Sequence, residues 1–268
     1  MTDPATNKYS LALSDVELQR YRLMADAARA TESELWQLAG LVEGARVADV
    51  GCGPGAMFPA IVDSVGPTGE VVGVDGDPNA IAAAQALVAA NGWTNVTTRV
   101  GKADATGLAP ASFDAVMMRH VLAHNGPTEQ SIVEHLATLV QPGGSVYLVD
   151  IDGPGMRVRP TDPDAEDLAD AYHRFHLAQG NDLEVGLRLR DLLTAAGFDV
   201  VAYRGWYNIL QPPSELRPPA WAARDAMVAA GIATPDDVAR WEAALDRLGA
   251  QRPTIYASLF GAVGRRPA

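Results

Sequence analysis

The chain has 268 residues, with 33 acidic and 21 basic side chains, a formal net charge of −12 and a sequence pI of about 4.8. Such an acidic chain, with no stripe of lysine and arginine, excludes a nucleic-acid binder and disfavours an anionic membrane surface as a partner. No apolar run reaches the roughly 20 residues of a membrane span, and the single cysteine excludes an internal disulfide framework. We therefore expect a cytoplasmic protein with neither a membrane nor a nucleic acid as partner.

Apolar periodicity predicts two helices at the start of the chain, over residues 15–30 and 32–41, before strands and helices alternate. Short apolar runs predict strands at 47–50, 70–75, 96–100, 113–119 and 145–151. The segments between them predict helices at 56–65, 79–91 and 129–140. Strands that are joined through helices by right-handed crossovers lie parallel to one another in a single sheet. The pattern therefore predicts an α/β fold with a doubly wound, mostly parallel, Rossmann-like sheet.

The last third of the chain has a different organisation. Two helices are expected at 165–179 and 184–196, and two further strands at 199–208 and 254–264 complete a seven-stranded sheet. A proline-punctuated segment between those strands predicts two more helices, at 221–230 and 235–248. The predicted parts are an N-terminal helical cap over 1–44, a core over 45–210 and 254–264 with lid helices at about 162–196, and a helical insert over 211–253. An insert of this kind serves as a lid or as the contact of a homodimer.

A short buried strand is predicted to run directly into a glycine turn and then a helix. Gly51, Gly53 and Gly55 carry no Cβ atom, so a ligand can approach the main chain closely at this turn. The pattern indicates a nucleotide-type cofactor, and two cofactors fit it. The spacing Gly51-x-Gly53-x-x-Ala56 is the dinucleotide pattern of NAD enzymes. With Asp49 before it, the same turn has an Asp-x-Gly-x-Gly-x-Gly form that resembles class I S-adenosylmethionine-dependent methyltransferases.

Acidic residues end the next two predicted strands. Asp75 lies where an acidic side chain can accept both ribose hydroxyls of an adenosine. At Asp104 a carboxylate can accept a hydrogen bond from the amino group of adenine, while the N–H of Ala105 can donate one to a ring nitrogen. Further along, residues 113–124 and 139–144 predict a strand, a helix and a Pro-Gly-Gly turn into the next strand. This order of elements is typical of class I methyltransferases.

Together these signals make residues 45–155 similar to the ubiquinone/menaquinone-methyltransferase-like, small-molecule group of class I S-adenosylmethionine-dependent methyltransferases. The likeness extends through 180–198 and to the helices that precede the glycine turn. It implies S-adenosyl-L-methionine as the cofactor. The residues that it implies for cofactor binding lie in the turn and at the strand ends: Asp49, Gly51, Gly53, Gly55, Asp75, Gly76, Asp104, Ala105, Arg119 and His120. Tyr21, in the first helix, either contacts this cofactor or belongs to the apolar stripe of Leu18 and Met24.

The methyl group on a sulfonium is already activated, so the protein mainly has to align donor and acceptor and exclude water. Some acceptors also need a base, and the catalytic candidates are His120, His124, His173 and His176. The first two follow the fourth strand, and the other two share one face of a predicted helix. We interpret His135 as a helix-flank residue. No metal is expected, because no third ligand with recognisable spacing accompanies either histidine pair.

The leading hypothesis is methyl transfer to a small-molecule acceptor in secondary metabolism, with O-methylation ahead of C- or N-methylation. An NAD-dependent oxidoreductase is the second hypothesis. The third is a non-methylating protein on the same fold, either a cyclase or a regulatory binding module. The acceptor depends on the segments around 160–180 and 211–250, and the fold does not specify it.

Overall fold

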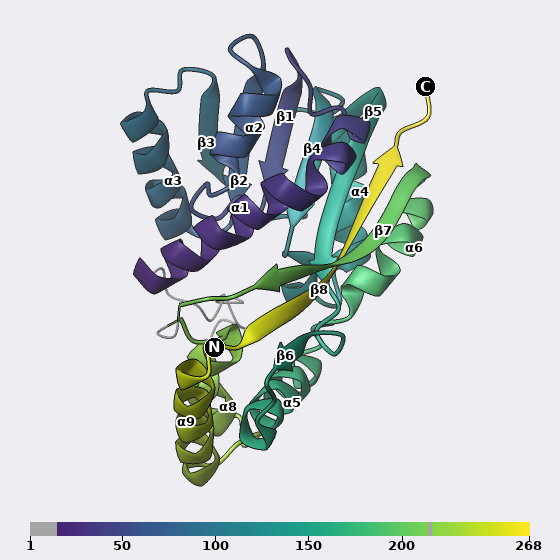
Figure 1. The fold of residues 1–268 in the computed structure, drawn as a ribbon. Coiled ribbons are helices and arrows are strands. Elements are labelled where there is room, and N and C mark those ends of the chain that lie inside the picture. The colour runs from purple at the N-terminus through teal and green to yellow at the C-terminus, as the bar shows by residue number, and fades with distance from the viewer. Residues whose placement is uncertain (1–14, 214–215) are drawn as a thin grey trace, which may run out of the picture.

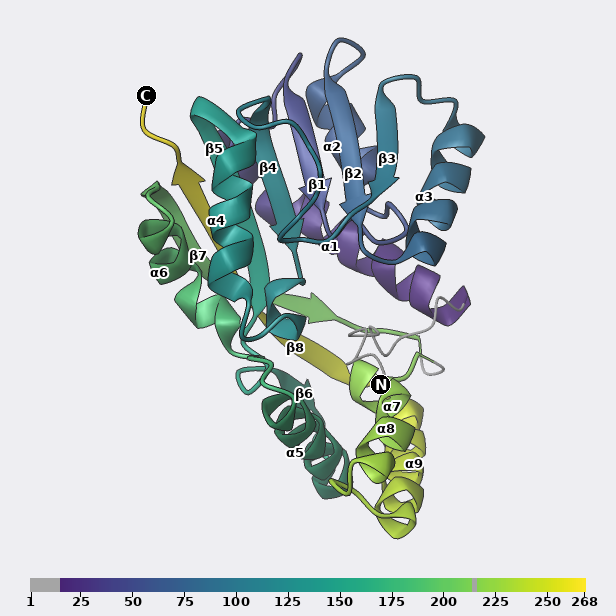
Figure 2. The same ribbon diagram turned by 180° about the vertical axis from the view of Figure 1, so that it is seen from behind.

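The computed structural model describes residues 15–213 and 216–268, and its centre is one mixed sheet with helices on both faces (Figures 1 and 2). Five strands are parallel, in the spatial order β3-β2-β1-β4-β5. They are β1 Arg46–Val50, β2 Glu70–Asp75, β3 Val96–Val100, β4 Phe113–Arg119 and β5 Val140–Ile151. Next to β5 lies β8 (Thr254–Arg265), which is antiparallel to it, and β8 pairs in turn with β7 (Asp199–Leu210), which again has the direction of the five parallel strands. The predicted doubly wound, mostly parallel α/β sheet is confirmed.

The sheet has one strand more than the seven predicted. The extra strand, β6 (Arg157–Arg159), pairs antiparallel with the first residues of β8. It is only three residues long and has a single apolar residue, so neither its length nor an apolar run marks it in the sequence. The predicted Pro-Gly-Gly turn is an irregularity inside β5. Val140 pairs with Phe113 and Ser145 with Ala115, so residues 141–144 interrupt the regular register.

The two faces of the sheet carry different helices. A strand has a side-chain period of two, so Val47 and Ala48 of β1 enter different apolar clusters. The cluster of Val47 includes residues of α1, α2 and α3, and that of Ala48 includes residues of α4 and α6. These helices are α1 Asp15–Leu38, α2 Phe58–Val65, α3 Pro78–Asn91, α4 Glu129–Leu139 and α6 Leu189–Ala195.

A single helix, α1, replaces the two that the sequence predicts before the glycine turn, so that prediction is wrong. The helix continues for 24 residues without a break. The hydroxyl of Thr31 donates to the carbonyl of Ala27 at 2.9 Å, which satisfies this polar side chain within the helix. Ala28 and Leu35, on either side of the expected break, pack in the same apolar cluster. This shared burial favours one continuous helix along the sheet.

Four helices form a bundle beyond the carboxyl edge of the parallel strands, at the bottom of Figure 1. We call it the outer bundle, and it consists of α5 Pro163–Ala178, α7 Pro219–Ala222, α8 Arg224–Ala229 and α9 Pro235–Ala250. Its own apolar cluster includes Phe175, Met227 and Trp241. The helix that follows the core and the helices of the insert are therefore packed together, although the chain between them returns to the sheet.

Two of the predicted C-terminal helices are divided. The helix expected over 221–230 is split into α7 and α8 at the buried Ala223. The helix expected over 184–196 begins as a 3-10 turn before α6. A Cβ atom at Gly186 would lie only 2.5 Å from the carbonyl oxygen of Ile151, so this turn packs main chain against β5. Within the described residues, no helix combines the length and the apolar content needed to cross a membrane.

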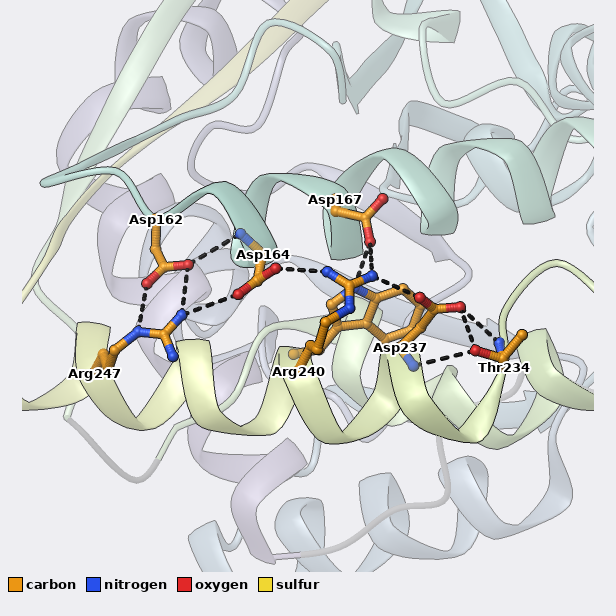
Figure 3. Close-up of polar contacts among 8 residues, drawn as sticks. Asp162, Asp164, Asp167, Thr234, Asp237, Arg240 and Arg247 are labelled. Atoms are coloured by element: carbon orange, nitrogen blue, oxygen red, sulfur yellow. Dashed lines mark hydrogen bonds and ion pairs between the residues drawn. The ribbon is translucent and has the colours of Figure 1, made fainter.

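Ion pairs hold α9 against α5 along one side of the outer bundle (Figure 3). Arg247 forms two hydrogen bonds with the carboxylate of Asp162, at 2.8 and 3.0 Å, at the N-cap of α5. Arg240 reaches Asp164 at 2.6 Å and Asp167 at 3.2 Å. These pairs are partly exposed, so solvent screens them and each adds little stability. They link α9 to α5, the helix that carries two of the histidine candidates.

Candidate functional site

The glycine turn lies where β1 ends, between the neighbouring strands β2 and β4. The connections from β1 and from β4 run on opposite faces of the sheet, and ligands of doubly wound sheets bind at such a point. Gly51, Gly53 and Gly55 have φ angles of +79°, +54° and +81°, in the left-handed region that favours glycine. The conformation of the turn therefore accounts for all three glycines.

The three glycines differ in what surrounds them. A Cβ atom at Gly51 would lie 2.3 Å from Cγ2 of Val121, and one at Gly55 would lie 2.7 Å from the ring of Phe58. At Gly53, by contrast, the nearest described atom to an added Cβ is Cε1 of Tyr21, 4.0 Å away. Gly53 is therefore the glycine that leaves room beside the main chain. The ring of Tyr21, from α1, borders this open space beside Gly53.

Asp75 ends β2, and its carboxylate is bound to the turn. Oδ2 accepts a hydrogen bond from the N–H of Gly53 at 2.8 Å, and Oδ1 accepts one from the N–H of Asp77 at 2.9 Å. Each carboxylate oxygen retains a further lone pair. Asp75 can therefore hold the turn and still accept hydrogen bonds from a ligand hydroxyl, and the first of these roles was not predicted from the sequence.

The residues expected to address adenine, Asp104 and Ala105, follow β3, while Gly76, expected under the adenosine, follows β2. All three are exposed. The N–H of Ala105 donates to the carbonyl oxygen of Lys102 at 3.0 Å. This N–H, which is predicted to serve a ring nitrogen of adenine, thus already has a partner within its own loop. The carboxylate of Asp104 remains a candidate for the adenine amino group.

Arg119 ends β4 and belongs to a buried network. Its guanidinium donates two hydrogen bonds to the carboxylate of Glu32, at 3.0 and 2.6 Å, with side-chain exposures of 7% and 0%. The hydroxyl of Tyr147 donates to the same carboxylate at 2.9 Å, and Nε1 of Trp36 does so at 3.4 Å. The network ties α1 to the sheet. Arg119 is predicted from the sequence to bind the cofactor, whereas Glu32 is not among the predicted residues; its sequence signal is a carboxylate within the apolar stripe of α1.

Asp49, near the end of β1, is a buried carboxyl group with one unused oxygen. The residue is 2% exposed, and its Oδ2 has no hydrogen-bond partner among the described residues. Burial raises its pKa to about 7, although the nearby charge of Arg119 acts in the opposite direction. Buried polar atoms without partners are uncommon. Asp49 is therefore a candidate to receive a donor group of a ligand bound at the turn.

Four histidines form a row that begins after β4 and ends on α5. His120 has a φ angle of +56°, uncommon outside glycine, and its N–H donates to the carbonyl of Val149 at 2.8 Å. The ring of His124 lies 5.1 Å from that of His176, centroid to centroid. His173 is close enough to His176 to influence its protonation. The structure therefore brings together four candidates that the sequence distributes over two separate segments.

The pKa values in this row are low. Burial lowers the pKa of His120 well below its usual value, and the charge of Arg119 lowers it further. The pKa of His124 falls to about 4 through burial. Burial also lowers the pKa of His176 to about 4, with contributions from His124 and His173. These three imidazoles are therefore neutral at pH 7, and they can exchange hydrogen bonds with a ligand without presenting a charge.

We expect His124 to remain neutral down to a pH of about 4. An unfolded chain binds a proton at this residue below pH 6.5, so His124 weakens the folded state as the pH falls from about 6.5 to 4. Nuclear magnetic resonance titration of the imidazole should show the low pKa. In urea unfolding, the loss of stability between pH 7 and pH 5 should be smaller in His124→Asn than in the wild type. A titration midpoint near 6.5 would contradict the buried environment.

Two further ionisable groups have structural partners. His135, on α4, bonds through Nε2 to the N–H and the hydroxyl of Thr106, at 3.1 and 2.8 Å, so it has a packing role on the flank of its helix. Asp150 accepts hydrogen bonds from the N–H groups of Ala123 and Ile151, and burial raises its pKa to about 7. In the part of the chain that the structure describes, no three histidine, cysteine or acidic side chains lie close enough together to hold a metal ion.

Residues 47–144 match the protein family described as "Methyltransferase domain". Over 151 residues the chain is 28% identical to a demethylmenaquinone methyltransferase of Bacillus cytotoxicus, which covers 56% of this chain and 60% of that protein. Over 117 residues it is 33% identical to a ubiquinone biosynthesis O-methyltransferase of Leptothrix cholodnii, covering 43% and 48%. The matched part is thus less than two thirds of the length of either relative.

Among solved structures, an S-adenosylmethionine-dependent methyltransferase from Aquifex aeolicus superposes with a TM-score of 0.54 at 16% identity. The match covers 94% of this chain and 99% of that one, and at this identity it shows the fold alone. The glycine turn and the strand ends described above lie within the region matched by the family or directly beside it. Residues 47–144 thus match a methyltransferase domain, and this part of the chain is similar to menaquinone and ubiquinone methyltransferases, which supports S-adenosylmethionine as the cofactor.

Proposed function

We propose that this protein transfers a methyl group from S-adenosylmethionine to a small-molecule acceptor, by O-methylation in secondary metabolism. The observation that carries the proposal is the left-handed glycine turn, with the N–H of Gly53 bonded to Asp75 and with open space beside Gly53. Neutral histidines at the adjoining strand end extend this site toward the outer bundle. The acceptor would thus be bound between the sheet and that bundle.

The residues present fit the cofactor that the family uses. The unpartnered Oδ2 of Asp49 can accept a hydrogen bond from its ammonium group, and Asp75 can accept from the ribose hydroxyls. Tyr21 covers the main chain at Gly53. When bound, S-adenosylmethionine supplies a methyl group that its sulfonium already activates. Arg119 takes part indirectly, because its ion pair with Glu32 holds α1 and therefore Tyr21 in place.

The histidines orient the acceptor and exclude water in this proposal. An imidazole with a pKa of about 4, as in His124 and His176, is a weak base at pH 7. A hydroxyl that is itself acidic, such as that of a phenol or an enol, needs little help from a base. The two curated relatives are named for demethylmenaquinone and for ubiquinone biosynthesis. A planar acceptor with an acidic hydroxyl therefore suits this site. We propose a cytoplasmic enzyme in which the insert over 211–253 serves as a lid or as the contact of a homodimer.

The first test is binding of S-adenosylhomocysteine, the demethylated product, by isothermal titration calorimetry. The wild type should bind it, and Asp75→Asn should bind at least tenfold more weakly. A hydrogen bond to a charged group is worth about 1.5–3 kcal/mol. Asp199→Asn, at an exposed position where β7 begins, is the matched control and should bind as the wild type does.

The same titration with NAD separates the two cofactor hypotheses. Binding of NAD without binding of S-adenosylhomocysteine would overturn the proposal and favour an oxidoreductase. Transfer of a labelled methyl group to phenols and hydroxyquinones then tests the reaction, and mass spectrometry with proton resonance spectra distinguishes O-methyl from C-methyl products. Cofactor binding without transfer to any acceptor would favour a cyclase or a regulatory protein.

A further inference from the structure

His176 is buried where the outer bundle meets the core. It lies near the end of α5 and is 4% exposed. Its ring packs edge-on against Tyr172 and Phe175 of the same helix, at centroid distances of 4.4 and 5.6 Å. Its third aromatic neighbour is His124, which follows β4 in the core. An aromatic surface of this kind favours a planar partner.

The hydrogen bonds of His176 determine which of its ring nitrogens carries the proton. The side-chain Nδ2 of Asn181 lies 3.1 Å from Nδ1 of His176. An amide nitrogen can only donate, so Nδ1 is the acceptor in this bond. A neutral imidazole has one protonated nitrogen, and in His176 this must be Nε2. Asn181 is itself 5% exposed, and its main-chain N–H donates to the carbonyl of His176 at 2.9 Å, which fixes the pair.

The protonated nitrogen, Nε2, has no hydrogen-bond partner among the described residues although it is buried. Leaving a buried donor unsatisfied costs about 1–3 kcal/mol. Nδ1 of His173, one turn earlier on α5, is also buried without a partner. Two such nitrogens on one helix face, beside the histidines that follow β4, indicate a ligand that completes these bonds.

We propose that Nε2–H of His176 donates a hydrogen bond to an oxygen atom of the methyl acceptor, and that the acceptor is a planar aromatic or quinonoid ring bearing a carbonyl or hydroxyl oxygen. This inference rests on the proposed function and assigns part of its substrate specificity to His176. A neutral N–H donor matches an oxygen lone pair and offers nothing to an ammonium group. An amine that is protonated at pH 7 is therefore a poor acceptor for this site.

The tautomer can be tested without any ligand. In ¹⁵N-histidine-labelled protein, Nε2 of His176 should show the chemical shift of a protonated nitrogen and Nδ1 that of an unprotonated one. Asn181→Asp replaces the donor with a carboxylate, which binds Nδ1–H and should reverse this pattern at neutral pH. A wild-type spectrum with the proton on Nδ1 would overturn the proposal.

The ligand is tested with three probes on protein saturated with S-adenosylhomocysteine: 1-naphthol, 1,4-naphthoquinone and the oxygen-free control naphthalene. At least one oxygen-bearing probe should shift the Nε2 resonance of His176, and naphthalene should not. His176→Leu should lower the affinity for that oxygen-bearing probe by about five- to tenfold and leave the affinity for naphthalene unchanged. His176→Gln, which keeps a donor at a similar reach, should recover part of the affinity.

A matched control is Leu177→Ala, an exposed neighbour on the same helix, which should bind all probes as the wild type does. The proposal is overturned if no oxygen-bearing probe shifts the Nε2 resonance, or if His176→Leu lowers the affinity for naphthalene as much as the affinity for the other probes. Binding of S-adenosylhomocysteine is measured in every variant. If the wild type fails to bind it, the proposed function is at fault; if it binds and the probes do not discriminate, only the role of His176 is at fault.

Discussion

Gly51→Ala is expected to destabilise the fold by about 2–4 kcal/mol and to lower the affinity for S-adenosylhomocysteine at least tenfold. Two costs combine at this position. An alanine with a φ angle near +79° is strained, and its Cβ would lie 2.3 Å from Cγ2 of Val121. Valine is stiff at χ1, so it cannot turn aside cheaply. Moving it would also displace the chain at His120, directly beside it.

The matched control is Gly143→Ala. Gly143 has nearly the same φ angle, +81°, but an added Cβ would meet no described atom within 4 Å. This variant should show the backbone cost alone, about 1–2 kcal/mol, with unchanged cofactor affinity. Adding Val121→Ala to the Gly51 variant should recover the steric part. Equal unfolding free energies for the two glycine variants in urea would show that Val121 yields freely.

The second large effect is expected at the buried ion pair. Arg119→Met leaves the carboxylate of Glu32 fully buried without its cationic partner, which should cost about 3–5 kcal/mol of unfolding free energy. In the double variant with Glu32→Gln no charge is left unpaired, and the amide oxygen can still accept from Tyr147. The double variant should therefore be more stable than Arg119→Met alone. Urea unfolding of the wild type, Arg119→Met, Glu32→Gln and the double variant gives the coupling energy between the two residues.

An exposed pair supplies the control for this cycle. Arg29 and Asp63 form the same kind of contact, at 2.5 Å, between side chains that are 50% and 66% exposed. Arg29→Met should change the unfolding free energy by less than about 1 kcal/mol. Similar values for Arg29→Met and Arg119→Met would show that burial does not govern these pairs. Because the buried pair anchors α1, we also expect Arg119→Met to displace Tyr21 and so to weaken the binding of S-adenosylhomocysteine.

Local patterns explain the parts of the fold that were predicted correctly. The parallel strands β1 to β4 and the helices after them are encoded by short apolar runs and by residues that end elements, such as Gly92 after α3. The glycine turn was recognisable because left-handed φ angles at Gly51, Gly53 and Gly55 demand glycine. These features depend on a few neighbouring residues, so they can be recognised in the sequence alone.

The errors share a physical cause, which is contact between distant segments. Burial against the sheet keeps α1 continuous through Thr31, and the main chain of β5 shapes the turn at Gly186. Periodicity and propensity carry no information about such contacts, which therefore override them.

The sequence by itself determined the class of sheet, the position of the glycine turn and the acidic residue at the end of β2, because each depends on a local pattern. Only the tertiary structure decided that Arg119 pairs with Glu32, since these residues are far apart in the chain and meet only when α1 packs on the sheet. It also decided that His124 and His176 are neighbours. The path of the chain through the outer bundle sets that contact, and no short stretch of sequence specifies it.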